Sequence, residues 1–336
     1  MNVFLYLQVQ HRIFSKPERQ RMITPRPFWY NDSIAPPANL STLSKNELTI
    51  VTAYFDIGMF QKGNEGTRSW LLYRKWLSVF ARIKNPVVAY FDNAEHADLM
   101  RVLRQKHPKT RIVVVDRQTL WTFREMEPRI AKIFSQKNYP RHPPNTIMST
   151  YPTVMHSKYE LMRRTIRDNP FHSAYFCWLD VGLFRGLANA NVSSTVDDSE
   201  LFQLAVPPDL NSTAVGYAVV SPRSPSTKLT SEAIVRGCCI WVCGCFFIGR
   251  VDVLFHWTTE FLTAVERMVS ENWISTDQEV ITWLMMGEGK TKIQPKSNLQ
   301  LFSGQRGNGI DPWFYLGYLA KKIGEQKAVS PTPRPT

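Results

Sequence analysis

The 336-residue sequence lacks an apolar run of the roughly 18–20 residues that a membrane-spanning helix needs. Its apolar N-terminal stretch, residues 1–9, is shorter than that and carries Asn2 and Gln8. We interpret this stretch as the remnant of a signal or anchor segment. Membrane attachment is therefore expected only through an N-terminal anchor that is incomplete in this sequence.

Two phosphate-binding fingerprints are also missing. No Gly-x-Gly-x-x-Gly follows the first predicted strand, and no complete Gly-x-x-x-x-Gly-Lys-Ser/Thr loop occurs. These glycine-rich loops bring backbone N–H groups close to phosphates in dinucleotide-binding and P-loop proteins. Their absence argues against both of these enzyme classes.

Acidic residues are fewer than basic ones, 28 against 41, so the formal net charge is +13. Such a balance favours anionic partners, namely nucleic acid, membrane surfaces or phosphorylated small molecules. The basic residues are spread along the chain, with no dense basic block interleaved with aromatic residues in its middle. This distribution argues against nucleic acid and leaves small phosphorylated ligands as the favoured partners.

Cysteine is scarce, and four of the five cysteines lie between Cys238 and Cys245. A zinc site would need further ligands at suitable spacing, and no second Cys/His cluster is present. We interpret these cysteines as small apolar strand residues. One local disulfide remains open, because spacing alone does not determine pairing.

An alternation of apolar strands and amphipathic helices begins after a Pro-rich N-terminal segment. Strands are predicted at 48–55, 86–91, 111–115 and 173–179, and helices at 65–83, 93–103, 121–137 and 154–168. This order is typical of a parallel sheet with helices on both faces. Further strands are predicted at 202–206, 214–220 and 239–249, followed by helices at 254–268 and from about 275.

Polar residues gather at the carboxyl ends of the predicted strands, where open α/β sheets bind their ligands. Thr52 and Tyr54 end the first strand and Asp92 follows the second. Asp180 follows the fourth strand, and Gly182 lies two residues later. A carboxylate beside a glycine suits a ligand that approaches the backbone. The alternative is a simple turn, since turns favour both residue types.

A second candidate group lies in the later half. Gly244 interrupts an apolar strand, and Asp277-Gln278 opens a helix. Asp277 precedes Val280, Ile281 and Leu284 by three, four and seven residues, which predicts a carboxylate on the buried side of that helix. The alternative is a capping box, with Thr276 as the cap and Glu279 at its third position. Lys158 and Arg185 are candidates for contacting a diphosphate, with a solvated helix face as the alternative for Lys158.

Four stretches of the chain carry a resemblance to a known family, and they contain Val51–Gly58, Trp178–Arg185, Gly244–Gly249 and Asp277-Gln278. Over roughly residues 46–320 the sequence resembles the HtrL/YibB-like family. In its broader pattern it resembles the glycosyltransferase-A superfamily of nucleotide-sugar transferases. That resemblance implies a Rossmann-like, mixed and mostly parallel central sheet flanked by helices, in a single large domain with two sub-regions. The expected division is a flexible stem at 1–45, a nucleotide-binding half at 46–185, an acceptor half at 186–322 and a disordered tail at 323–336.

The resemblance also implies a transfer reaction from a nucleotide sugar to a glycan or other acceptor. It implies Asp180 as a ligand of a divalent cation, manganese in that superfamily, and Asp277 as the catalytic residue. The residues that it implies for substrate binding are Thr52, Tyr54, Asp92, Lys158, Gly182, Arg185, Gly244 and Gln278. Related enzymes bind manganese with an Asp-x-Asp motif, and Gly182 replaces its second Asp here.

Two alternatives to this reading remain open. One is a transferase-fold protein without catalytic activity that binds glycans or a partner enzyme, which the missing second Asp favours. The other is a nucleotidyltransferase, for which the segment 63–68 would be the glycine- and arginine-bearing loop.

The compartment is predicted from four Asn-x-Ser/Thr sequons, at Asn31, Asn39, Asn191 and Asn211. Such triplets are acceptors for N-glycosylation in secreted proteins. With the stem-like N-terminus, they predict the secretory pathway, in the lumen of the Golgi or the endoplasmic reticulum.

Overall fold

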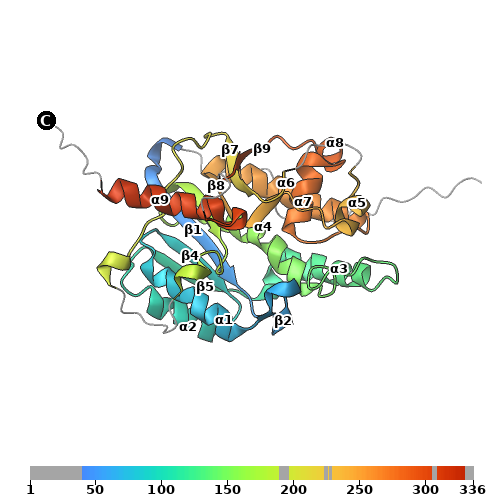
Figure 1. Cartoon of the computed structure of the whole chain (residues 1–336), viewed down its shortest axis with the longest axis horizontal. Helices are drawn as coiled ribbons and strands as arrows, with labels where there is room; N and C mark the ends of the chain where they lie inside the picture. Colours follow the sequence, from blue (N-terminus) through green and yellow to red (C-terminus); the bar gives the residue numbers. More distant parts are fainter. Residues whose placement is uncertain (1–39, 189–196, 223–225, 227–228, 305–308, 330–336) are drawn as a thin grey trace, which may run out of the picture. The chain divides into compact units, whose positions relative to one another are not determined.

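The central element of the computed structural model is a seven-stranded sheet in the order β5-β4-β1-β6-β8-β7-β9, counted over the described residues (Figure 1). The structure describes residues 40–188, 197–222, 226, 229–304 and 309–329. All of them belong to one unit, Ile34–Thr336.

Four parallel strands form the first part of this sheet: β5 (Thr110–Val114), β4 (Val87–Phe91), β1 (Ser44–Tyr54) and β6 (Ser173–Leu179). β4 and β6 are buried on both faces, which explains their nearly uninterrupted apolar sequence.

The remaining strands extend the sheet without interruption past the predicted boundary between its two halves. β8 (Val242–Arg250) lies antiparallel between β6 and β7 (Ala214–Val219), and β9 (Asn298–Phe302) runs parallel to β7. The predicted α/β fold with a mixed, mostly parallel sheet is thereby confirmed.

Helices cover both faces of the sheet. On one face, α1 (Trp70–Leu77), α2 (Ala94–Leu103) and α9 (Tyr315–Val329) contribute to one apolar core cluster, which includes Ile50 of β1 and Leu179 of β6.

On the other face lie α4 (Thr150–Asp168) and α6 (Val251–Ser270), which pack against each other (Figure 1). Tyr159 of α4 stacks on Phe261 of α6, with ring centroids 3.4 Å apart, and on Phe247 of β8 at 5.2 Å. The shorter helices are α3 (Glu127–Phe134), α5 (Ser231–Arg236), α7 (Asp277–Met286) and α8 (Gly289–Ile293).

The helix predicted at 65–83 begins later than expected, at Trp70. The preceding residues form a small hairpin of β2 (Phe60–Gln61) and β3 (Thr67–Arg68) instead. Gly63 and Gly66 have positive φ values of 49° and 88°, a conformation that ends helical or extended structure and that glycine adopts at little cost. The hairpin places residues 60–68 at the carboxyl edge of the sheet.

The strand predicted at 202–206 is wrong. The Asn85 side chain accepts from Leu204 N–H at 2.7 Å and donates to the Leu204 carbonyl at 3.0 Å, so a side chain takes the place of a strand partner. Phe202 makes only an isolated bridge with Ile83 within the described residues. Near the other end of the chain, α9 continues to Val329 through part of the segment predicted as a disordered tail. Residues 1–39 and 330–336 lie outside the described residues.

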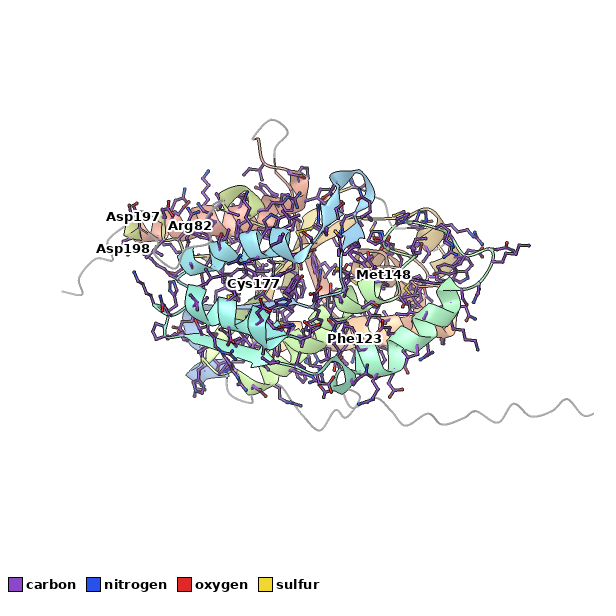
Figure 2. All side chains as sticks on the ribbon, turned by 90° about the horizontal axis from the view of Figure 1, so that it is seen from below. Arg82, Phe123, Met148, Cys177, Asp197 and Asp198 are labelled. Carbon is purple, nitrogen blue, oxygen red and sulfur yellow. A yellow bond between two sulfur atoms is a disulfide. The ribbon has the colours of Figure 1, made fainter. Side chains whose placement is uncertain are left out.

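Arg82 connects the two sides of the gap at 189–196. Its guanidinium donates to the Leu187 carbonyl at 2.8 Å and to the Glu200 carbonyl at 3.2 Å. Figure 2 shows Arg82 near the surface residues Asp197 and Asp198, whereas Cys177 lies in the interior. None of the described helices combines the length and apolar character that crossing a bilayer requires.

Candidate functional site

The strand order reverses between β1 and β6, because the chain adds β4 and β5 on one side of β1 and then β6 on the other. Open α/β sheets bind ligands at the carboxyl ends of the strands beside such a reversal. A cavity of about 630 Å³ lies there, lined at its base by Tyr54 from the end of β1 and Asp180 after β6. The predicted site residues that line it are Tyr54, Lys158, Asp180, Gly182, Arg185, Gly244, Asp277 and Gln278.

A lysine bridges the two predicted carboxylates at the base of the cavity. Lys158 Nζ, on α4, lies 3.2 Å from Asp180 Oδ1 and 3.1 Å from Asp277 Oδ2. It also donates to the Gly244 carbonyl at 3.1 Å. Because an ammonium has three donors, these three acceptors satisfy it completely.

The exposure of the three charged groups differs. The side chains of Lys158 and Asp277 are 4% and 3% exposed, whereas that of Asp180 is 32% exposed. Trp178 Nε1 donates to Asp180 Oδ1 at 2.6 Å and fixes this carboxylate from the side of β6. Asp180 is thus the member of the group that presents most of its carboxylate to the cavity.

Burial and charge act against each other in this group. Burial disfavours the ammonium form of Lys158, but the charges of Asp180 and Asp277 outweigh burial and raise the pKa of Lys158. Burial raises the pKa of Asp180, and the Lys158 charge opposes that shift. The ammonium therefore stays charged at neutral pH and lies beside the partly exposed carboxylate of Asp180.

Gly244 is required by its contact with Asp277. A Cβ built on Gly244 would lie 2.1 Å from Asp277 Oδ2 and 2.7 Å from its Cγ. No side chain fits there unless the carboxylate leaves Lys158. The sequence prediction placed a substrate against Gly244, and the structure places the Asp277 carboxylate against it.

The residues just before α7 are held by Tyr139 and by His156 of α4. Tyr139 accepts from Ile274 N–H at 2.8 Å and donates to the Ile274 carbonyl at 2.5 Å, and His156 Nε2 lies 2.9 Å from the Ser275 carbonyl. Burial lowers the pKa of His156 to about 3, so this ring is neutral and its Nε2–H donates to that carbonyl. These bonds fix the backbone immediately before Asp277.

The capping box considered as the alternative at Thr276 takes another form. The Thr276 hydroxyl bonds the Glu279 carboxylate at 2.6 Å, and no side-chain cap to the backbone forms. Gln278 donates from Nε2 to the Val242 carbonyl at 3.1 Å, which ties α7 to β8. Asp277 points to the buried side, as its spacing predicted.

Cationic side chains from the hairpin and from the turn after β6 line one side of the cavity. Arg68 and Arg185 both approach the same carboxylate of Glu65, at 2.5 and 3.9 Å. Lys62 donates to the hydroxyl of Tyr151 and lies 4.9 Å from the centroid of that ring. Burial lowers the pKa of Lys62. This side therefore has three cations and one direct carboxylate partner among the described residues.

Aromatic side chains form further walls. Trp76 lies beneath Gly182, where a Cβ would be 3.0 Å from its ring, so any larger residue would push into the indole. The Arg185 guanidinium lies 4.5 Å from the Phe314 ring centroid, and Tyr73 and Trp313 also line the cavity. Planar, apolar faces of this kind suit stacking with a base or a sugar ring.

Thr52 and Asp92 are not among the residues that line the cavity. Thr52 is fully buried, and its hydroxyl donates to the Leu179 carbonyl at 2.7 Å, which joins β1 to β6. Asp92 accepts from Arg117 Nε at 2.6 Å and from Asp56 N–H at 3.2 Å. Both residues therefore make structural contacts near the carboxyl ends of the strands, outside the cavity lining.

The cysteine cluster contains one disulfide, between Cys243 and Cys245 on either side of Gly244. Both residues line the cavity. Cys177 and Cys239 are free thiols, and Cys238 Sγ donates to Glu279 Oε1 at 3.5 Å. The local disulfide that the spacing left open is thus present on β8.

The model of a family described as "Bacterial protein of unknown function (HtrL_YibB)" matches residues 46–288, a range that contains the whole group of Lys158, Asp180, Gly244 and Asp277. The chain belongs to the HtrL/YibB family. A search among curated proteins found no match. A crystal structure of mouse xyloside xylosyltransferase 1 in its apo form is similar to this HtrL/YibB chain with a TM-score of 0.36 and 9% identity, over 77% of this chain and 86% of that chain. A likeness at this level carries no argument.

The expected divalent cation does not fit the HtrL/YibB site as it is arranged. The position shared by Asp180 and Asp277, where a cation would bind two carboxylates, is taken by Lys158 Nζ. A dication there would face an ammonium within a few ångströms. Among the described residues, no three His, Cys, Asp or Glu side chains form a cluster suited to a metal.

Among the lining residues of this HtrL/YibB cavity that sequence reasoning did not name are Lys62, Trp76 and Tyr151, and Arg68 entered only as part of the alternative loop 63–68. Lys62 and Arg68 lie in the segment 60–68, which was assigned partly to a helix. The glycines at 58, 63 and 66 were the signal for a structured loop at a strand end. Trp76 and Tyr151 lie on helix faces whose apolar pattern does not separate core contacts from cavity walls.

Proposed function

We propose that this protein transfers a sugar from a nucleotide-sugar donor to an acceptor hydroxyl, with the donor bound in the cavity between the ends of β1 and β6. The observation that carries the proposal is the group of Asp180, Lys158 and Asp277 at the base of that cavity. Two carboxylates bridged by a lysine, beside cationic and aromatic walls, match a ligand that combines sugar hydroxyls, a diphosphate and a planar base.

The charges suggest how the donor lies. Lys62, Arg68 and Arg185 line one side with Glu65 as their nearby carboxylate, which favours the diphosphate there. Asp180 presents its partly exposed carboxylate at the base, where it can accept hydrogen bonds from sugar hydroxyls. The anomeric carbon would then lie between the two regions, and Phe314 and Trp76 would bound the ring or the base.

The reaction requires one proton acceptor. The bond from the anomeric carbon to the diphosphate oxygen breaks and its electron pair leaves with the diphosphate. A bond from the acceptor oxygen to that carbon forms, and the hydroxyl proton passes to a carboxylate. We assign this role to Asp277, whose Oδ2 accepts from Lys158 Nζ at 3.1 Å, and a positioned general base contributes about 10²- to 10⁴-fold in rate.

The test is release of nucleoside diphosphate from a panel of nucleotide sugars, with and without acceptor. Wild type is expected to release it from at least one donor, and Asp277→Asn to do so at least about 10²-fold more slowly. Asp277→Asn should retain most of its affinity for the nucleotide. The exposed Glu95→Gln on α2 serves as a charge-matched control.

Two other outcomes would replace the proposal. Binding of a nucleotide sugar or a glycan without any turnover would favour the inactive binding protein. Release of pyrophosphate from a nucleoside triphosphate and a sugar phosphate would favour the nucleotidyltransferase. A location in the secretory pathway remains part of the proposal and is tested separately below.

A further inference from the structure

Two carboxylates and one backbone carbonyl hold the Lys158 ammonium in place. Its side chain is 4% exposed, and its three donors match Asp180, Asp277 and the Gly244 carbonyl. Gly244 leaves room for the Asp277 carboxylate against the backbone, and Trp178 fixes Asp180. The chain therefore builds a complete coordination shell for an ammonium at the position where a cation would join the two carboxylates.

The leaving diphosphate still needs positive charge. Arg68 and Arg185 share Glu65, whereas the hydrogen bond of Lys62 goes to a neutral phenol. Burial raises the pKa of Tyr151, so this phenol keeps its proton and does not neutralise Lys62. Lys62 is thus a lining ammonium whose charge has no direct ion-pair partner within the described residues.

We propose that this site binds the diphosphate of its donor without a divalent cation, because Lys158 holds the cation position between Asp180 and Asp277 and Lys62 contacts the diphosphate. The inference deepens the proposed function and rests on it. It differs from the sequence prediction in two ways: Lys158 supports the carboxylates beneath the cavity, and Lys62 makes the contact expected of Lys158.

The first test measures Mn²⁺ alone, by the loss of its free EPR signal on titration into protein. Wild type is expected to leave the signal unchanged. Lys158→Ala frees the shared position and is expected to bind Mn²⁺ at least about tenfold more tightly than wild type does. Stoichiometric Mn²⁺ binding by wild type that Asp180→Asn abolishes would overturn the proposal.

The second test stays informative if Lys158→Ala does not fold. Inorganic pyrophosphate is titrated into wild type in EDTA by calorimetry. Lys62→Met should weaken binding by about tenfold or more, the usual effect of losing a hydrogen bond between charged groups. Lys75→Met, an exposed lysine on α1 outside the cavity lining, removes the same charge and should leave binding within about twofold. Equal losses in both variants, or no binding in EDTA, would overturn the role of Lys62.

A donor titration separates this inference from the proposed function. Nucleotide-sugar binding in EDTA supports both. Binding that requires Mn²⁺ overturns the inference and leaves the proposed function standing. Pyrophosphate binding through Lys62 without binding of any nucleotide sugar overturns the proposed function and leaves a cation-independent anion site.

Discussion

Replacing Lys158 by methionine tests the charge arrangement beneath the cavity. The substitution keeps the apolar stem and removes the ammonium that pairs with Asp180 and Asp277. Asp277, 3% exposed, would keep a buried charge without its partner, a change that costs about 3–5 kcal/mol. Asp180 is 32% exposed, so water solvates its carboxylate when the ammonium is gone. The loss of this second ion pair should therefore cost no more than ~1 kcal/mol of stability.

The double variant tests whether the loss in Lys158→Met comes from the unpaired Asp277 carboxylate. Asp277→Asn alone leaves Lys158 with Asp180 and the Gly244 carbonyl, so its loss should be the smaller of the two. Lys158→Met with Asp277→Asn removes the uncompensated charge and should be more stable than Lys158→Met. The coupling between the two changes should be about 2 kcal/mol or more, as for residues in one buried network.

The assay is urea-induced unfolding of all four proteins at pH 7 and pH 5, followed by tryptophan fluorescence. The loss in Lys158→Met should shrink at pH 5, because an uncompensated buried carboxyl has a raised pKa and binds a proton in the folded state. A loss below about 1 kcal/mol, or additive effects of the two substitutions, would refute the buried ion-pair account.

Three further predictions concern the neighbouring residues. Gly244→Ala should destabilise the protein and abolish turnover, because its Cβ would lie 2.1 Å from Asp277 Oδ2. The control Gly249→Ala, on the same strand, places its Cβ 3.1 Å from Leu254 and should retain turnover. Equal activity of the two variants would contradict this prediction. His156 has a pKa lowered from 6.5 to about 3, so the unfolded chain binds a proton that the folded chain does not, and stability should fall as the pH drops below 6.5. The slope is about 1.4 kcal/mol per pH unit, and His156→Gln should remove it in urea titrations between pH 4 and 7; a slope unchanged by this substitution would exclude His156 as the source. The exposed sequon residue Asn211 should carry a glycan in a eukaryotic host, and an unchanged mobility of wild type after endoglycosidase treatment would count against the secretory assignment.

The repeated strand–helix pattern predicted the fold well, because strands buried on both faces leave a strong signal in the sequence. Asp180 was predicted from its place after β6, and Asp277 from its spacing to Val280 and Leu284. Both predictions used local information. Lys158 joins the two carboxylates, but it lies 22 residues from Asp180 and 119 residues from Asp277 in the sequence. Such a contact leaves no local pattern in the sequence.

The misassigned parts have physical reasons. The segment 202–206 has strand-like composition, but Asn85 satisfies the backbone of Leu204 and prevents a ladder. The hairpin at 60–68 depends on Gly63 and Gly66, which have positive φ. The helical spacing of the apolar residues that follow led to a predicted helix that began too early, at residue 65. Gly244 was predicted to contact a substrate, and in the structure the Asp277 carboxylate lies against its backbone.

The most direct test of the central claim is the melting temperature of wild type and Asp180→Asn across a panel of nucleotide sugars. A ligand that binds the folded state at 100 times its dissociation constant adds about 2.7 kcal/mol to stability. We predict a saturable rise in wild type with at least one nucleotide sugar, and no rise in an Asp180→Asn variant that melts within a few degrees of wild type without ligand. If no nucleotide sugar stabilises wild type, or if Asp180→Asn responds equally, the cavity is not the donor site.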